Sequence, residues 1–296
     1  MDASLSARFF TGNKMESAAP QYLIPQFNSK PGRGVLQFLR TETGTVLQRQ
    51  FAQNPLKFLH PRNHGCGAWV YSSTYGGGLV GGDALDVQIK VDAHATAFYS
   101  TQSSTKVYRS ELATSQALHA TVDSGGLLII APDPLVCFAD SQFSQTQHFS
   151  LAGDANLVFV DWLSAGRVAM GERWAFRHYE NKTTIEQHGD EILHDVLRLN
   201  PEQGPITSRL RRFNSFASIV LCGPRLAQFG ADIQAELAAA PLKRNADLLC
   251  TASPLRNSGT LLRILGTSVE EVGRNIHATL SFVPTLLGDN PWSRKW

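Results

Sequence analysis

The sequence predicts an all-β fold, mainly β with two short helices near the C-terminus. Short apolar stretches recur along most of the chain, separated by turns rich in glycine and proline, as in all-β proteins. Between residues 85 and 91, Leu, Val, Ile and Val alternate with polar residues, a period of two typical of a strand with one buried face. Only two segments have a composition and spacing that favour helix.

Strands are predicted in chain order over residues 35–40, 46–51, 69–72, 85–91, 95–100, 117–122, 127–131, 146–151, 157–162, 173–181, 183–187 and 191–199. The last two flank His188-Gly189-Asp190, which predicts a hairpin turn because glycine accepts a positive φ. The helices are predicted over residues 226–240, ended by Pro241, and 269–279, after a Ser268 cap.

The pattern contains no repeat of fixed period and no Gly/Ser-rich linker. It therefore predicts a single β-rich domain over residues 31–296. Residues 1–30 form a polar N-terminal extension, part of which is expected to be disordered.

Composition excludes several classes of function. With 43% hydrophobic residues, 18% charged residues and a net charge of +2, neither nucleic acid nor a membrane is expected as a partner. No apolar run approaches the ~18 residues of a membrane span. The cysteines include no C-x-x-C pair, which indicates reduced thiols in a cytoplasmic protein. The basic cluster Arg209, Arg211 and Arg212 is interpreted as a solvated strand face.

Glycines cluster between residues 76 and 82. Gly76, Gly78 and Gly81 satisfy G-x-G-x-x-G, but a dinucleotide site requires this loop to open a helix, and here it joins two strands. Two interpretations remain: a turn in which backbone passes close to backbone, or a loop kept free of side chains so that a partner or ion can reach Asp83.

Two sets of residues are candidates for metal chemistry. His60, His64 and Cys66 have ligand types suited to nickel, zinc or copper. Pro61 and Gly65, however, prevent the helix that would align these side chains. Histidines in loops are usually solvated. The second set consists of Asp83, Asp161 and Glu172, with Lys106 and Arg167 as counter-ions.

These carboxylates have three interpretations. They could form structural ion pairs, line a polar path that passes a divalent cation along by weak binding, or serve a β-scaffold hydrolase or carbohydrate-binding protein. The chain lacks G-x-S-x-G, H-E-x-x-H and a Walker A lysine, so no nucleophile motif supports an enzyme.

Four ordered blocks together resemble the UreD/UreH family of urease accessory proteins. They are GGLVGGD over residues 77–83, then Thr101, Lys106, Tyr108 and Arg109, then GGLLIIAPDP over residues 125–134, and finally Asp161, Gly166, Arg167, Gly171, Glu172 and Trp174. The resemblance is continuous over residues 32–199 and thins beyond residue 201.

The resemblance implies a two-layer or helical stack of strands and a non-enzymatic factor in urease maturation. Such a factor binds urease apoprotein and a helical UreF-type protein, through which it meets a UreG-type GTPase. It has no tightly bound cofactor, but nickel would pass through it transiently, along a path matching Asp83, Lys106, Asp161 and Glu172. In the tail, exposed Trp and Arg favour a partner contact through Trp292, Arg294 and Trp296.

Overall fold

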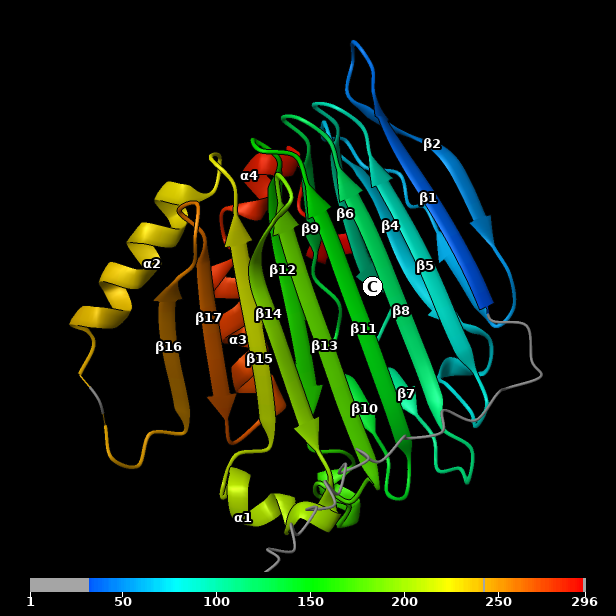
Figure 1. Cartoon of the computed structure of the whole chain (residues 1–296), viewed down its shortest axis with the longest axis vertical. Coiled ribbons are helices and arrows are strands. Elements are labelled where there is room, and N and C mark those ends of the chain that lie inside the picture. The colour runs from blue at the N-terminus through cyan, green and yellow to red at the C-terminus, as the bar shows by residue number, and fades with distance from the viewer. Residues whose placement is uncertain (1–31, 242, 295–296) are drawn as a thin grey trace, which may run out of the picture.

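Two β-sheets face each other, and the chain passes back and forth between them (Figure 1). The computed structural model describes residues 32–241 and 243–294, so the predicted N-terminal extension lies outside the described residues. One sheet has seven strands in the order β14-β13-β11-β8-β5-β1-β2. The other has ten and runs β16-β17-β15-β12-β9-β6-β4-β3, with β10 joining β12 to β7. The all-β prediction is confirmed.

The strands of the seven-stranded sheet are β1 (Gly32–Arg40), β2 (Thr45–Ala52), β5 (Ala84–Val91), β8 (Thr114–Val122), β11 (Gln142–Leu151), β13 (His178–Gln187) and β14 (Asp190–Leu199). Those of the ten-stranded sheet are β3 (Leu56–Leu59), β4 (Ala68–Thr74), β6 (Thr96–Thr101), β7 (Thr105–Val107), β9 (Leu127–Ile130), β10 (Leu135–Cys137), β12 (Asn156–Ser164), β15 (Ser215–Cys222), β16 (Leu248–Pro254) and β17 (Thr260–Gly266).

The centre of the molecule is a β-helical coil, in which strands from β4 to β13 alternate between the sheets. Within each sheet, strands of successive turns pair in parallel: β5 with β8, β8 with β11, and β11 with β13. On the other side β4, β6, β9 and β12 pair in the same way. Ala84 thus lies beside Ser115 of the next turn, and Ser115 beside Ser144 of the one after. The stacked, helical arrangement implied by the family resemblance is confirmed.

Alternation along each strand decides which side chains enter the space between the sheets. Leu85, Val87, Ile89 and Val91 of β5 all belong to this core, as their period of two predicts. Phe149 of β11 and Phe159 of β12 meet across the gap, with ring centroids 4.8 Å apart. Aromatic contacts of this kind join the two sheets.

The helices between residues 227 and 287 cover the outer face of the ten-stranded sheet (Figure 1). Val158 and Ile219 of that face pack with Val272 and Ile276 of α3. Ser268 caps α3 by accepting from the Glu271 amide at 3.1 Å. The helices are α1 (Ile206–Leu210), α2 (Ala227–Ala239), α3 (Val269–Thr279) and α4 (Val283–Leu287), with 3-10 turns η1 (Tyr75–Gly77), η2 (Val168–Met170), η3 (Pro201–Gln203) and η4 (Pro291–Arg294). None of the helices in the described ranges is long and apolar enough to cross a membrane.

Both predicted helices are present as α2 and α3, and the hairpin at residues 188–190 is confirmed, with His188 and Gly189 at φ 55° and 86°.

Two predictions were wrong. Residues 173–181 and 183–187 are not separate strands, because Trp174 takes a φ of 53° and the single strand β13 begins at His178. Arg209 lies in the last turn of the short helix α1 and Arg211 directly follows the helix, so the basic cluster is not a strand face.

The C-terminal segment packs against its own chain. The Tyr71 hydroxyl donates to the Pro291 carbonyl oxygen at 2.6 Å, and the Trp292 ring meets Phe98 edge-on with centroids 6.3 Å apart. Trp292 is half-buried, so part of its surface is used within the fold. The other residues predicted to contact a partner, the side chain of Arg294 and all of Trp296, lie outside the described residues.

Ending the chain after Leu287 is therefore expected to destabilise the protein. The lost hydrogen bond and aromatic contact together contribute about 2 kcal/mol to the free energy of unfolding. Urea unfolding of this variant beside one ended after Ser293, which keeps both contacts, measures the difference. Equal midpoints would show that the segment does not stabilise the fold.

Candidate functional site

A layer of polar side chains interrupts the apolar core between the two sheets. We call it the interior polar layer. Among its buried members, Gln147 and Asn181 are each 5% exposed and Asp161 is 9% exposed. The layer consists of Gln116, Gln145, Gln147, Asn181 and Thr183 from the seven-stranded sheet and Ser72, Thr101, Asp161 and Ser218 from the ten-stranded sheet.

Strand register assembles this layer. Gln116, Gln145 and Asn181 occupy equivalent positions on β8, β11 and β13, so their side chains form one row. The Gln145 and Gln147 amides donate to the Asn181 Oδ1 at 3.3 and 3.2 Å. On the opposite sheet, Ser72 lies beside Thr101, and Asp161 beside Ser218. Buried polar groups remain stable only when paired, and the neighbouring turns of the coil supply most of the partners.

Asp161 is the carboxylate at the centre of the layer. Its Oδ2 accepts a hydrogen bond from the Asn181 amide at 2.7 Å, and its Oδ1 accepts one from Gln145 at 3.4 Å. Burial raises its pKa from 3.8 to about 7, with a further contribution from the negative charge of Asp195. Near neutral pH this group can therefore gain or lose a proton.

A cavity of about 80 Å³ lies beside Asp161. Gln116, Gln145, Gln147 and Thr101 line it, and Gly77 and Ser103 belong to the loops around it. A single water needs roughly 10–15 Å³, so the cavity has room for several. Further along the layer, the buried Ser218 hydroxyl has no hydrogen-bond partner among the residues that the structure describes, which indicates a place for water or a ligand.

The glycine-rich stretch joins strand β4 to strand β5, as predicted, and Gly78 fits the interpretation of a turn in which backbone passes close to backbone. A Cβ on Gly78 would come within 2.7 Å of the Lys106 carbonyl oxygen, so this glycine permits close backbone packing. Gly77 has a φ of 71° and lines the cavity. Asp83 does not line the cavity; its Oδ2 accepts from the Val80 amide at 2.9 Å and closes the turn.

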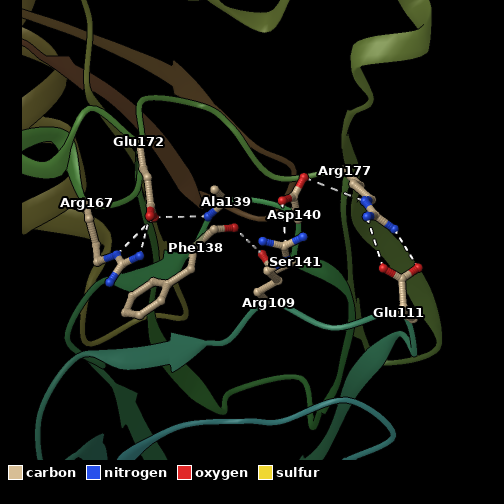
Figure 2. A network of polar contacts seen from close by, with 9 residues as sticks. All are labelled: Arg109, Glu111, Phe138, Ala139, Asp140, Ser141, Arg167, Glu172 and Arg177. Atoms are coloured by element: carbon tan, nitrogen blue, oxygen red, sulfur yellow. Dashed lines mark hydrogen bonds and ion pairs between the residues drawn. The ribbon is translucent and has the colours of Figure 1, made fainter.

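Glu172 belongs to an ion-pair network at the surface (Figure 2). Arg167 donates to both of its carboxylate oxygens and lies 4.2 Å from the centroid of the Phe138 ring. The same carboxylate accepts from the Ala139 amide at 3.1 Å, and these hydrogen bonds, mainly that from Arg167, lower its pKa. Beside it, Arg177 joins Glu111 to Asp140, which also meets Arg109. This network fixes three loops to one another.

The structure thus separates the residues that the sequence grouped together. Of Asp83, Lys106, Asp161, Arg167 and Glu172, only Asp161 lines the cavity, while Lys106 is exposed on β7 next to the lining residue Thr105. His64 and Cys66 pack against the C-terminal segment, where the Cys66 Sγ contacts the Leu287 carbonyl oxygen at 3.5 Å. Within residues 32–241 and 243–294, no three His, Cys, Asp or Glu side chains are arranged to hold a metal ion.

Sequence reasoning missed the amides that surround Asp161. Gln145 and Gln147 occupy the same alternating positions as the core residues Phe143 and Phe149 of β11. Polar residues at inward positions of two neighbouring strands are the signal that identifies this layer.

Replacing Asp161 with Asn is expected to stabilise the protein in a pH-dependent way. Between pH 4 and 7 the folded wild type keeps a proton that the unfolded chain has lost, so its stability falls as pH rises. Asn carries no such charge, so the variant should exceed the wild type by about 4 kcal/mol at pH 8 and match it near pH 4. Urea unfolding at both pH values measures this. A constant difference would show that Asp161 has an ordinary pKa.

Comparisons with known proteins agree with the sequence blocks. The family model described as "UreD urease accessory protein" matches residues 30–296. The chain is 46% identical to the urease accessory protein UreD of Sorangium cellulosum, over 90% of this chain and 85% of the relative. It is 39% identical to the protein of the same name from an Anaeromyxobacter species, over 91% of each chain. Urease accessory protein D of Arabidopsis thaliana is 36% identical over 62% of this chain and 65% of its own length.

The match extends over nearly the whole chain and includes every strand of both sheets. The chain therefore belongs to the UreD family of urease accessory proteins.

Proposed function

We propose that this protein is a non-enzymatic scaffold that assists the delivery of nickel to urease. Membership of the UreD family supports a role in urease maturation. Within that role, nickel would be cargo that moves through the protein, and the interior polar layer would be the part that receives it.

The observation that carries this proposal is the placement of Asp161 in a buried layer of amides and hydroxyls beside a cavity. Passage of an ion requires sites that bind favourably but weakly. One carboxylate among neutral oxygen ligands meets that requirement. The pKa of Asp161 is raised to about 7, so near neutral pH a share of the molecules carries a protonated Asp161 and an uncharged layer. A cation that enters the layer would displace this proton.

The proposed partners are urease apoprotein, a UreF-type protein and, through it, a UreG-type GTPase that hydrolyses GTP. Support for a contact surface comes from Met170 and Leu112, which are 73% and 54% exposed. Met170 lies between the paired residues Arg167 and Glu172, and Leu112 follows Glu111, so both are on segments that the ion-pair network joins. Exposed apolar side chains on loops fixed in this way are suited to binding another protein. We place these events in the cytoplasm, since all four cysteines are free.

The hydrolase interpretation finds no support in the geometry. Glycoside hydrolysis needs two carboxylates facing each other across the scissile bond. Asp83 closes a turn and Glu172 is held by Arg167, and neither lines the cavity beside Asp161.

Replacing Gln147 with Leu is expected to lower urease activation by about tenfold or more in a host that depends on this protein. The change puts an apolar side chain into the polar layer and removes a hydrogen bond to Asn181, which itself donates to Asp161. Urease activity, apoprotein level and nickel content of the purified urease are measured together. The expected result is normal apoprotein that is poor in nickel.

Thr146→Leu is the matched control, because Thr146 precedes Gln147 on β11 but faces solvent. The proposal fails if the Gln147 variant is folded and yields urease with full nickel content. It also fails if both variants reduce activation equally.

A further inference from the structure

Positively charged side chains gather at one end of the ten-stranded sheet. Two segments supply them: helix α1 with the turn that leads into β15, and the segment between α2 and β16. Figure 1 shows both segments at the end of the sheet where β15 begins and β17 ends. We call this group the α1 basic patch, and it consists of Arg209, Arg211, Arg212, Lys243 and Arg244.

The two segments are in direct contact, although they lie about thirty positions apart in the chain. The Arg212 guanidinium donates to the Ala246 carbonyl oxygen at 2.7 Å. The Ala246 amide in turn donates to the Lys243 carbonyl oxygen at 3.2 Å, which folds the second segment into a turn beside the first. All five side chains of the patch are exposed, so they share one surface.

The charge of this patch is not balanced within the described part of the chain. None of its five cations forms an ion pair with a carboxylate there, whereas Arg167 and Arg177 each do. The two segments contain only two acidic residues, Glu202 and Asp247, against the five cations. The patch therefore carries a net positive charge that a partner with carboxylates could neutralise.

Arg211 is held in a backbone conformation that is unfavourable for a residue with a side chain. Its φ is 48°, a region that glycine enters far more readily. Arg173 donates to the Arg211 carbonyl oxygen, and also to that of Phe213 at 3.1 Å. The Trp174 Nε1 donates to the same Phe213 oxygen at 3.0 Å. Strained residues fixed by their neighbours in this way cluster at functional sites.

Exposed apolar side chains border the patch and indicate the class of partner. The Asn214 carbonyl oxygen accepts from the Ala165 amide at 2.7 Å, and Arg173 bonds to the same turn, so the loop between them begins and ends beside the patch. This loop carries Met170, 73% exposed, and Val168, 41% exposed. Nucleic acid binding requires many phosphate contacts and gains little from such side chains. A protein offers carboxylates and apolar groups together.

We propose that the α1 basic patch is the docking surface for an acidic segment of a protein partner, with Met170 and Val168 at its apolar border. The inference rests on the proposed function for the existence of a protein partner, and it adds the face that the partner contacts and the chemistry of the contact. Opposite charge steers the partner's carboxylates onto the patch and fixes their orientation, while the apolar contact slows dissociation.

The test is binding of the purified full-length protein to each proposed direct partner, urease apoprotein and the UreF-type protein, by biolayer interferometry at low and at high salt. At least one partner is expected to bind wild type, more weakly as salt rises. Arg211→Glu and Arg244→Glu are each expected to weaken that complex by roughly tenfold at low salt.

Arg256→Glu is the matched control, because it makes the same change in net charge at an exposed arginine. Arg256 follows β16, whereas the patch precedes that strand, so the two lie at opposite ends of it. This variant is expected to bind both partners as wild type does.

Arg211→Gly separates a docking role of the side chain from a structural one. Glycine accepts the positive φ, so the urea unfolding midpoint of this variant is expected to equal or exceed that of wild type. Its partner binding is nevertheless expected to weaken severalfold, because the guanidinium is gone. If Arg211→Glu does not fold, Arg211→Gly and Arg244→Glu decide the question.

The inference is overturned if the folded patch variants bind both partners as tightly as wild type, if Arg256→Glu weakens binding equally, or if neither partner binds wild type. A duplex DNA probe is measured alongside. Patch variants that lose binding to DNA alone would assign the patch to nucleic acid and would also overturn the inference.

Failure of this inference is distinguishable from failure of the proposed function. Binding measurements test the patch, whereas the nickel content of urease matured with Gln147→Leu tests the delivery role. Weakened binding by the patch variants, together with full nickel content for Gln147→Leu, would support the patch and contradict the delivery role. Unchanged binding with nickel-poor urease for Gln147→Leu would support the delivery role and contradict the patch.

Discussion

The parallel register of the β-helical coil is the constraint on which the rest of the structure depends. It places each inward residue beside the equivalent residue of the next turn, so apolar rows such as Ile89, Ala120, Phe149 and Ile185 form a continuous core. The same rule applies to polar residues. A single inward glutamine would be an unpaired buried amide, but Gln145, Gln147 and Asn181 on adjacent strands bond to one another.

This arrangement allows a carboxylate to be buried and still leaves it able to exchange a proton near neutral pH. Asn181 and Gln145 donate to Asp161, yet desolvation still raises its pKa to about 7. Glu172 is the opposite case, because Arg167 holds it at the surface as a charged structural residue. Two acidic residues from one sequence block therefore have different physical roles: the first faces a cavity, and the second fixes a loop (Figure 2).

Much of the fold was predictable from the sequence, because alternation within 85–91 and the Ser268 cap are local signals. The coil produces no sequence repeat, because parallel pairing requires only that neighbouring inward side chains pack together, not that they be identical. One such row consists of Val91, Val122, Leu151 and Gln187. Asp161 was among the carboxylates predicted as candidate site residues. Its amide partners were missed, because their proximity depends on register between strands far apart in the chain.

The central claim is that the polar layer between the sheets admits a divalent cation. The most direct measurement is a crystal structure of the protein soaked in Ni²⁺, with anomalous diffraction recorded at the nickel absorption edge. The account predicts an anomalous peak between the sheets within coordination distance of Asp161, absent in crystals of Asp161→Asn. Peaks confined to the outer surface, with Asp161 still bonded to Asn181 and Gln145, would contradict it.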